Sequence, residues 1–104
     1  AGCQDGLMIE VEPQVPEPLN VQVKVPGEEN WIFQCPSTHP RVECGENSLF
    51  MADFTPEEVT LVLTWDGGWI TRTLQPTYTI LEPNGPRCPP KCRRALYHLA
   101  LSMH

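Results

Sequence analysis

Cysteine is the residue type with the clearest chemical potential in this chain. The sequence has five cysteines, so at least one lacks a disulfide partner within the chain. The short interval between Cys35 and Cys44 suits a local disulfide. Cys3 then pairs with Cys88 or with Cys92, and we favour Cys88 because that bond ties the first strand to the end of the last. Cys92 is left as a free thiol or as a bond to a partner chain.

Zinc binding is the alternative use for these thiols. Cys35, Cys44, Cys88 and Cys92 supply thiolates and His39 an imidazole, the ligand types that zinc prefers. Neither pair of cysteines has the two-residue spacing of a zinc knuckle. We therefore expect no metal site and no cofactor.

Catalytic groups are sparse in the sequence. It contains no Gly-rich phosphate loop, metalloprotease helix or nucleophile elbow. A thiol-protease pair of Cys92 and His98 would need a reduced cysteine, and cysteines in a chain of this composition are usually oxidised. We expect no catalytic residues and predict that the protein is not an enzyme.

The composition favours a location outside the cell. The chain has 104 residues, of which 12 are prolines and 19% are charged. A domain this small buries little apolar surface, and disulfides compensate for that in secreted proteins and ectodomains. No apolar run reaches membrane-spanning length, so we expect no direct membrane insertion by these residues.

Charge is unevenly distributed along the chain. The net charge is −6, and four of the seven basic residues fall in one stretch, at Arg87, Lys91, Arg93 and Arg94. Nucleic-acid binding needs a broad basic face. One local basic cluster on an acidic chain does not supply it, so we expect no nucleic-acid partner.

The strongest structural signal is a β-hairpin made by residues 59–65 and 68–74. Both stretches are rich in β-branched and aromatic residues, and Asp66-Gly67 between them suits a two-residue turn. That register puts aliphatic residues on one face and threonines with Trp69 on the other. Indole side chains are frequent interface anchors. The candidate binding surface combines the hairpin tip and the basic cluster: Trp65, Asp66, Trp69, Arg87, Lys91, Arg93 and Arg94.

The remaining elements point to an all-β fold. Alternation or β-rich composition predicts further strands at residues 7–12, 19–25, 31–35, 49–54 and 77–81. Only the C-terminal stretch has helical spacing, with Leu96, Leu99, Ala100 and Met103 at three- and four-residue steps. We predict a disulfide-stapled antiparallel β-sandwich over residues 1–90. Residues 91–104 would form a short helix or a linker to a missing element.

The run CQDGLMIEV, from Cys3 to Val11, resembles the first strand of a ZP-N module, the immunoglobulin-like half of the zona pellucida domain of egg coats and several receptors. The resemblance spans Cys3 to Cys88. It implies four cysteines paired first with fourth and second with third, here Cys3 with Cys88 and Cys35 with Cys44. It also implies an immunoglobulin-like sandwich that acts in cell-surface or gamete recognition.

Together these patterns predict an extracellular module for protein–protein recognition or adhesion, belonging to a receptor or an egg-coat-type matrix protein. Its partner would be a receptor, a ligand or a matrix component. One alternative is a secreted signalling ligand that forms a covalent dimer through Cys92. Another is a small secreted inhibitor that acts through the loop between Cys35 and Cys44.

Overall fold

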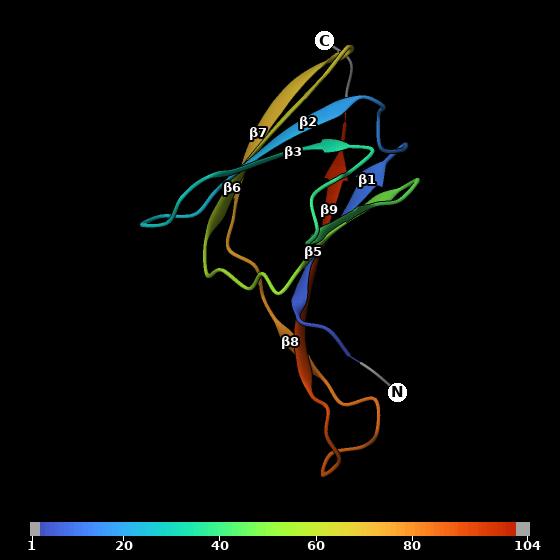
Figure 1. The fold of residues 1–104 in the computed structure, drawn as a ribbon, viewed down its shortest axis with the longest axis vertical. Helices are drawn as coiled ribbons and strands as arrows, with labels where there is room; N and C mark the ends of the chain where they lie inside the picture. Colours follow the sequence, from blue (N-terminus) through green and yellow to red (C-terminus); the bar gives the residue numbers. More distant parts are fainter. Residues whose placement is uncertain (1–2, 102–104) are drawn as a thin grey trace.

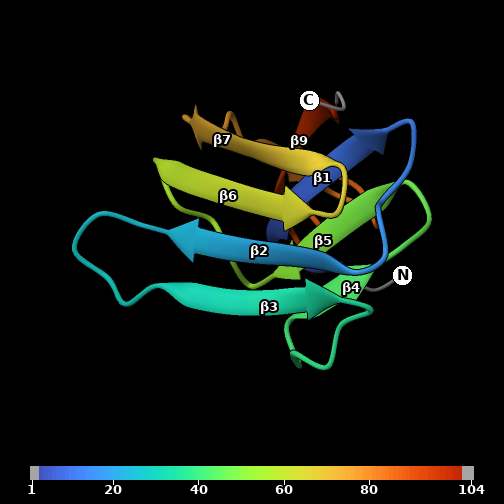
Figure 2. The ribbon, with the colours of Figure 1, turned by 90° about the horizontal axis from the view of Figure 1, so that it is seen from above.

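Two β-sheets stack on each other in the computed structural model, which describes residues 3–101 (Figures 1 and 2). One sheet has the strand order β4-β5-β1-β9-β8, and the other has the order β3-β2-β6-β7. The predicted disulfide-stapled all-β sandwich is confirmed at this level. The strands are β1 (Gly6–Glu12), β2 (Leu19–Lys24), β3 (Trp31–Cys35), β4 (Val42–Cys44), β5 (Ser48–Ala52), β6 (Val59–Trp65), β7 (Gly68–Leu74), β8 (Thr79–Leu81) and β9 (Cys92–Ala100).

One strand pair departs from the antiparallel expectation. β1 and β9 run parallel, with Leu7 opposite Ala95 and Val11 opposite Leu99, while the other pairs between described strands are antiparallel. Parallel neighbours need a long connection between them. Here the whole intervening chain is that connection, so the first and last strands can lie side by side in the middle of one sheet.

The core lies between the two sheets and follows the alternation of the sequence. Leu7 and Ile9 of β1 face Val21 of β2 and Leu61 and Leu63 of β6, and each is at most 1% exposed. The residues between them point outward, as expected for sheets that each have one solvated face. Each of these aliphatic side chains stabilises the fold by about 1.5–3 kcal/mol through burial.

The β6–β7 hairpin has the predicted register. Trp65 pairs with Gly68 and Leu63 with Ile70, around the two-residue turn Asp66-Gly67. On the outer face, the Oγ1 atoms of Thr60 and Thr73 lie 2.9 Å apart in a hydrogen bond. The sequence therefore specified both the turn and the side of the hairpin that is buried.

The C-terminal helix prediction is wrong over the described residues. Residues 92–100 form β9, the longest strand, and there is no helix between residues 3 and 101. Ala95 and Leu99 point into the core beside β1. Pairing with β1 therefore outweighs the helical spacing of the apolar residues in this segment. β9 is thus an integral part of the sandwich and not a linker after residue 90. Residues 102–104, including Met103, lie outside the described residues.

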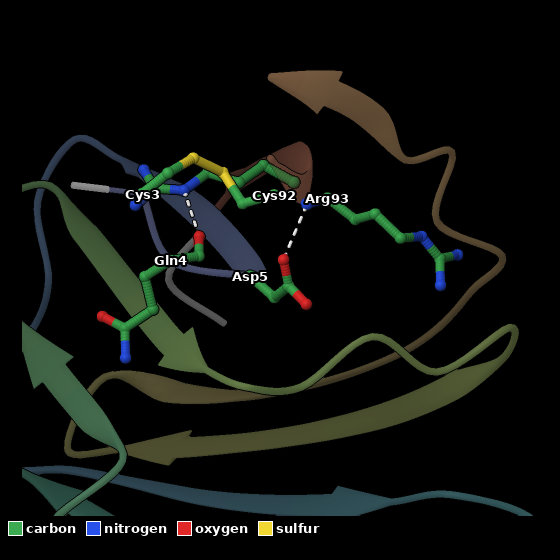
Figure 3. The surroundings of a disulfide bond; sticks show 6 residues. Cys3, Gln4, Asp5, Cys92 and Arg93 are labelled. Atoms are coloured by element: carbon green, nitrogen blue, oxygen red, sulfur yellow. Dashed lines mark hydrogen bonds between the residues drawn. A yellow bond between two sulfur atoms is a disulfide. The ribbon is translucent and has the colours of Figure 1, made fainter. Parts of the chain in front are cut away.

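The disulfides also differ from the preferred pairing. Cys3 bonds to Cys92, the alternative partner (Figure 3). Cys88 is free and exposed. The parallel β1–β9 register explains this, because it places the start of β9 beside the segment that precedes β1. Asp5 accepts a hydrogen bond from the Arg93 amide there, at 2.8 Å.

Cys35 and Cys44 are bonded as predicted. Cys35 ends β3 at the edge of one sheet, and Cys44 ends β4 at the edge of the other, on the same side of the sandwich (Figure 2). The bridge therefore fastens the two layers together at that side.

Tyr78 fixes the connection between β7 and β8. Its hydroxyl donates a hydrogen bond to the Pro56 carbonyl at 2.7 Å, and the Arg93 guanidinium lies 5.0 Å from its ring centre. Burial raises the pKa of Tyr78 from 10.0 to about 12, partly opposed by the positive charge of Arg93.

Ionisation of Tyr78 is expected to destabilise the fold at high pH. Its pKa is higher in the folded chain, so the stabilising effect of the neutral phenol is complete below pH 10.0 and is lost as pH approaches about 12. Tyr78→Phe should remove the highest-pH phase from a titration of phenolate absorbance. It should also cost about 1 kcal/mol of stability at neutral pH through the lost hydrogen bond. Identical titration curves for the two proteins would contradict this.

Candidate binding surface

The seven residues of the predicted binding surface do not lie together. The β6–β7 turn lies at the end of the molecule toward which β9 runs, whereas the loop between β8 and β9 projects at the opposite end (Figure 1). The molecule extends 48 Å along this axis. Trp65, Asp66 and Trp69 are thus separated from Arg87, Lys91, Arg93 and Arg94.

The two hairpin tryptophans have different environments. Trp65 is in phase with the inward-facing residues of β6 and packs against the core. Trp69 points away from the core and is 63% exposed. Only Trp69 therefore has the exposure that an interface anchor needs.

The basic residues are mostly engaged within the molecule. The Arg94 guanidinium lies 4.7 Å from the centre of the Phe50 ring, and its Nε donates to the Gln4 carbonyl at 2.8 Å. Arg93 covers Tyr78, and the Lys91 ammonium lies 3.7 Å from a carboxylate oxygen of Glu82. These contacts hold β9 to its neighbours, and Arg87 is the basic residue that remains as an exposed loop side chain.

A different surface emerges from the sheet register: the outer face of β3-β2-β6-β7. Side chains pointing outward from adjacent strands form continuous rows, since Gln22 lies between Ile32 and Val62, and Thr64 lies between Asn20 and Trp69. We call this the amide–hydroxyl face. Its residues are Asn20, Gln22, Lys24, Ile32, Gln34, Thr60, Val62, Thr64, Trp69, Thr71 and Thr73.

Charge is depleted on the amide–hydroxyl face. Its one charged residue is Lys24, and it has no carboxylate, although the chain carries 13 acidic residues. Two large apolar side chains stand out from it, Ile32 at 70% exposure on β3 and Trp69 at 63% on β7. The cores of protein interfaces are likewise poor in charge and rich in aromatic anchors.

Much of the amide–hydroxyl face was already indicated by the sequence. The threonine-rich side of the hairpin and Trp69 were identified from the register alone. Ile32 was missed as a binding residue, although the phase of Trp31, Phe33 and Cys35 already placed it on the outer side of β3. The order of the strands could not be read from the sequence, so nothing showed that β2 and β3 extend the same face.

The loop between Cys35 and Cys44 is folded against the end of the sandwich. The His39 ring stacks on Trp31 with centroids 5.2 Å apart, and the Arg41 guanidinium lies 4.5 Å from the centre of the Trp31 ring. Arg41 Nε donates to the Ala52 carbonyl at 3.1 Å, and its Nη2 donates to the Asp53 carbonyl. The side chains of Trp31, His39 and Arg41 are therefore packed against one another, and Arg41 is also bonded to the backbone.

The described residues contain neither a membrane-spanning helix nor a metal-binding cluster. Between residues 3 and 101 there is no helix suited to crossing a membrane, and no group of three or more His, Cys, Asp or Glu residues is arranged to hold a metal ion. Comparison of the chain with protein-family models, with curated proteins and with solved structures found no match.

Proposed function

We propose that the protein is an extracellular recognition module that binds another protein through the amide–hydroxyl face. The observation that supports this is the placement of Ile32 and Trp69 on opposite edge strands of a face without carboxylates. A partner covering the face would bury both side chains. It would also meet the amides and hydroxyls between them, which give hydrogen bonds without the desolvation cost of charged groups.

An extracellular location is supported by the oxidised cysteines. Cys3–Cys92 closes nearly the whole chain, and Cys35–Cys44 fastens one sheet to the other. Structural disulfides of this kind form and persist in oxidising compartments.

We further propose that this module is related to the immunoglobulin-like ZP-N module. Among the four bonded cysteines, the first pairs with the fourth and the second with the third, which is the connectivity that the resemblance implies. Cys92 takes the fourth position in place of Cys88. This relation would assign the module to cell-surface or gamete recognition.

A secreted ligand is the second candidate, because Cys88 is a free, exposed thiol in the loop before β9. The covalent dimer first assigned to Cys92 would form through Cys88 instead. Such a ligand would act as a disulfide-linked pair, whereas the recognition module needs no covalent partner.

Trp69→Ala and Ile32→Ala are each expected to weaken partner binding by about 2 kcal/mol, or roughly thirtyfold in dissociation constant. The assay is a screen of purified extracellular domains against the immobilised protein, followed by titration of any domain that binds. Ile80→Ala is the matched control, because Ile80 of β8 is 53% exposed but lies in the other sheet. Equal loss in all three variants, or no loss for Trp69→Ala, would contradict the proposal.

A further inference from the structure

The outer edge of β9 is open over most of its length. β8 pairs with residues 92–94 of β9, and no described strand pairs with residues 95–100 on the side away from β1. A pocket of ≈ 180 Å³ lies between β9 and the 75–77 connection, lined in part by Pro76, Ala95 and Tyr97. The connection lies beside residues 95–97 of β9 without pairing with them as a strand.

The backbone groups at this edge can be assigned from the ladder. Leu101 donates its amide to Glu12 at 2.8 Å and Arg93 donates its amide to Asp5, both on the β1 side. Amides and carbonyls of successive residues in a strand point to alternate sides. The amides and carbonyls of Leu96, His98 and Ala100 therefore point outward, where the described residues offer them no partner.

The other long edges have features that discourage strand addition. β7 carries Arg72 at a register position that points inward, and such inward charges protect edge strands. β3 is flanked by the His39 ring, which contacts both Trp31 and Phe33. β9 has neither proline, lysine nor carboxylate in residues 95–100.

We propose that a second copy of this chain adds to this edge, with the two β9 strands antiparallel about a twofold axis at His98. Leu96 of one copy then lies opposite Ala100 of the other, and Tyr97 lies opposite Leu99. Leu96, which is 54% exposed, would meet the smaller Ala100, and Tyr97, which is 37% exposed, would meet the buried Leu99. The contact is isologous, as in most homodimers.

The surroundings of β9 fit this arrangement. Leu101 of the second copy would lie opposite Ala95, beside the pocket lined by Pro76 and Tyr97. The antiparallel orientation also sends the two projecting β8–β9 loops to opposite ends of the joined sheet. His98 Nδ1 lies 3.0 Å from a carboxylate oxygen of Glu10, so each imidazole at the axis has a carboxylate beside it.

Amide hydrogen exchange on the wild-type residues of β9 tests the proposal without altering them. Measurements compare dilute and concentrated protein, up to about 1 mM, in a Cys88→Ser background that excludes covalent dimers. Concentration should slow exchange at Leu96, His98 and Ala100, and leave Tyr97 and Leu99 protected throughout. Unchanged exchange at the three outward amides would overturn the proposal.

Sedimentation equilibrium of edge variants gives an independent test. Leu96→Lys should weaken dimerisation by about tenfold or more, because a lysine on an edge strand opposes pairing. Ile80→Lys is the matched control, since Ile80 is 53% exposed on β8 and lies outside the paired segment. A monomer at all concentrations, or a dimer insensitive to Leu96→Lys, would overturn the inference. Binding of a partner to the amide–hydroxyl face would be unaffected by either outcome.

Discussion

Replacing Cys3 and Cys92 together by alanine is expected to lower the free energy of unfolding by about 4–5 kcal/mol. The bond joins residues 89 positions apart, so its loss greatly increases the conformational freedom of the unfolded chain. A domain of this size has a total stability of about 5–15 kcal/mol. Urea denaturation monitored by tryptophan fluorescence should therefore show a protein that is marginally folded or unfolded in buffer.

Two comparisons make this result specific. Cys88→Ser changes an exposed, unbonded thiol and should alter stability by about 0.5 kcal/mol or less. Removing the Cys35–Cys44 bond should cost about 2–3 kcal/mol, since it closes a loop of separation 9. A loss below about 1 kcal/mol for the Cys3 and Cys92 variant would contradict a structural role for that bond.

Gly6→Ala is expected to destabilise the fold by about 3 kcal/mol through overpacking. A Cβ atom at this position would collide with the Met51 carbonyl of the neighbouring strand and would lie 2.6 Å from Cζ of Phe50. The Arg94 guanidinium lies over the Phe50 ring, which is only 8% exposed, so the ring has little freedom to move away. Thermal unfolding should detect the change as a clear decrease in Tm.

Gly45→Ala is the matched control for this prediction. The nearest atom to its added Cβ is the Ser48 side-chain oxygen at 3.1 Å, which can rotate aside. The substitution should therefore change stability by less than about 1 kcal/mol. Similar Tm values for the two glycine variants would show that β1 and β5 can separate enough to accept a methyl group, against the packing described for Phe50.

The sequence correctly predicted those features of the fold that depend on residues close together in the chain. The Asp66-Gly67 turn and the two faces of its flanking strands sufficed to set the β6–β7 register, because a shift of one residue would expose Leu61 and Leu63. The alternation in β2 likewise gave its buried side. In these strands, secondary-structure preference and tertiary burial require the same arrangement.

The wrong predictions concern features that depend on contacts between residues far apart in the sequence. Leu96, Leu99 and Ala100 have helical spacing, but β1 offers residues 94–100 a complete row of parallel partners, and this pairing determines the structure. The choice of Cys92 over Cys88 follows from the same pairing. Because the sequence does not reveal which strands are neighbours, it could not give that choice or the extent of the amide–hydroxyl face.

The two proposed interaction sites use different parts of the sandwich. The amide–hydroxyl face would bind a partner through side chains, with Trp69 and Ile32 as anchors. The edge of β9 belongs to the other sheet and would join a second copy through its backbone. A dimer would therefore leave both copies of the amide–hydroxyl face available, which increases avidity for a partner with two binding sites.

The oxidation state of the cysteines in protein isolated from its native source is the most direct test of the proposed extracellular, disulfide-closed sandwich. The measurement is alkylation of the denatured, unreduced protein followed by peptide mass spectrometry. We predict cross-linked peptides joining Cys3 to Cys92 and Cys35 to Cys44, with Cys88 either alkylated or bonded to a second chain. Alkylation of all five cysteines would contradict the extracellular assignment and the recognition role that depends on it.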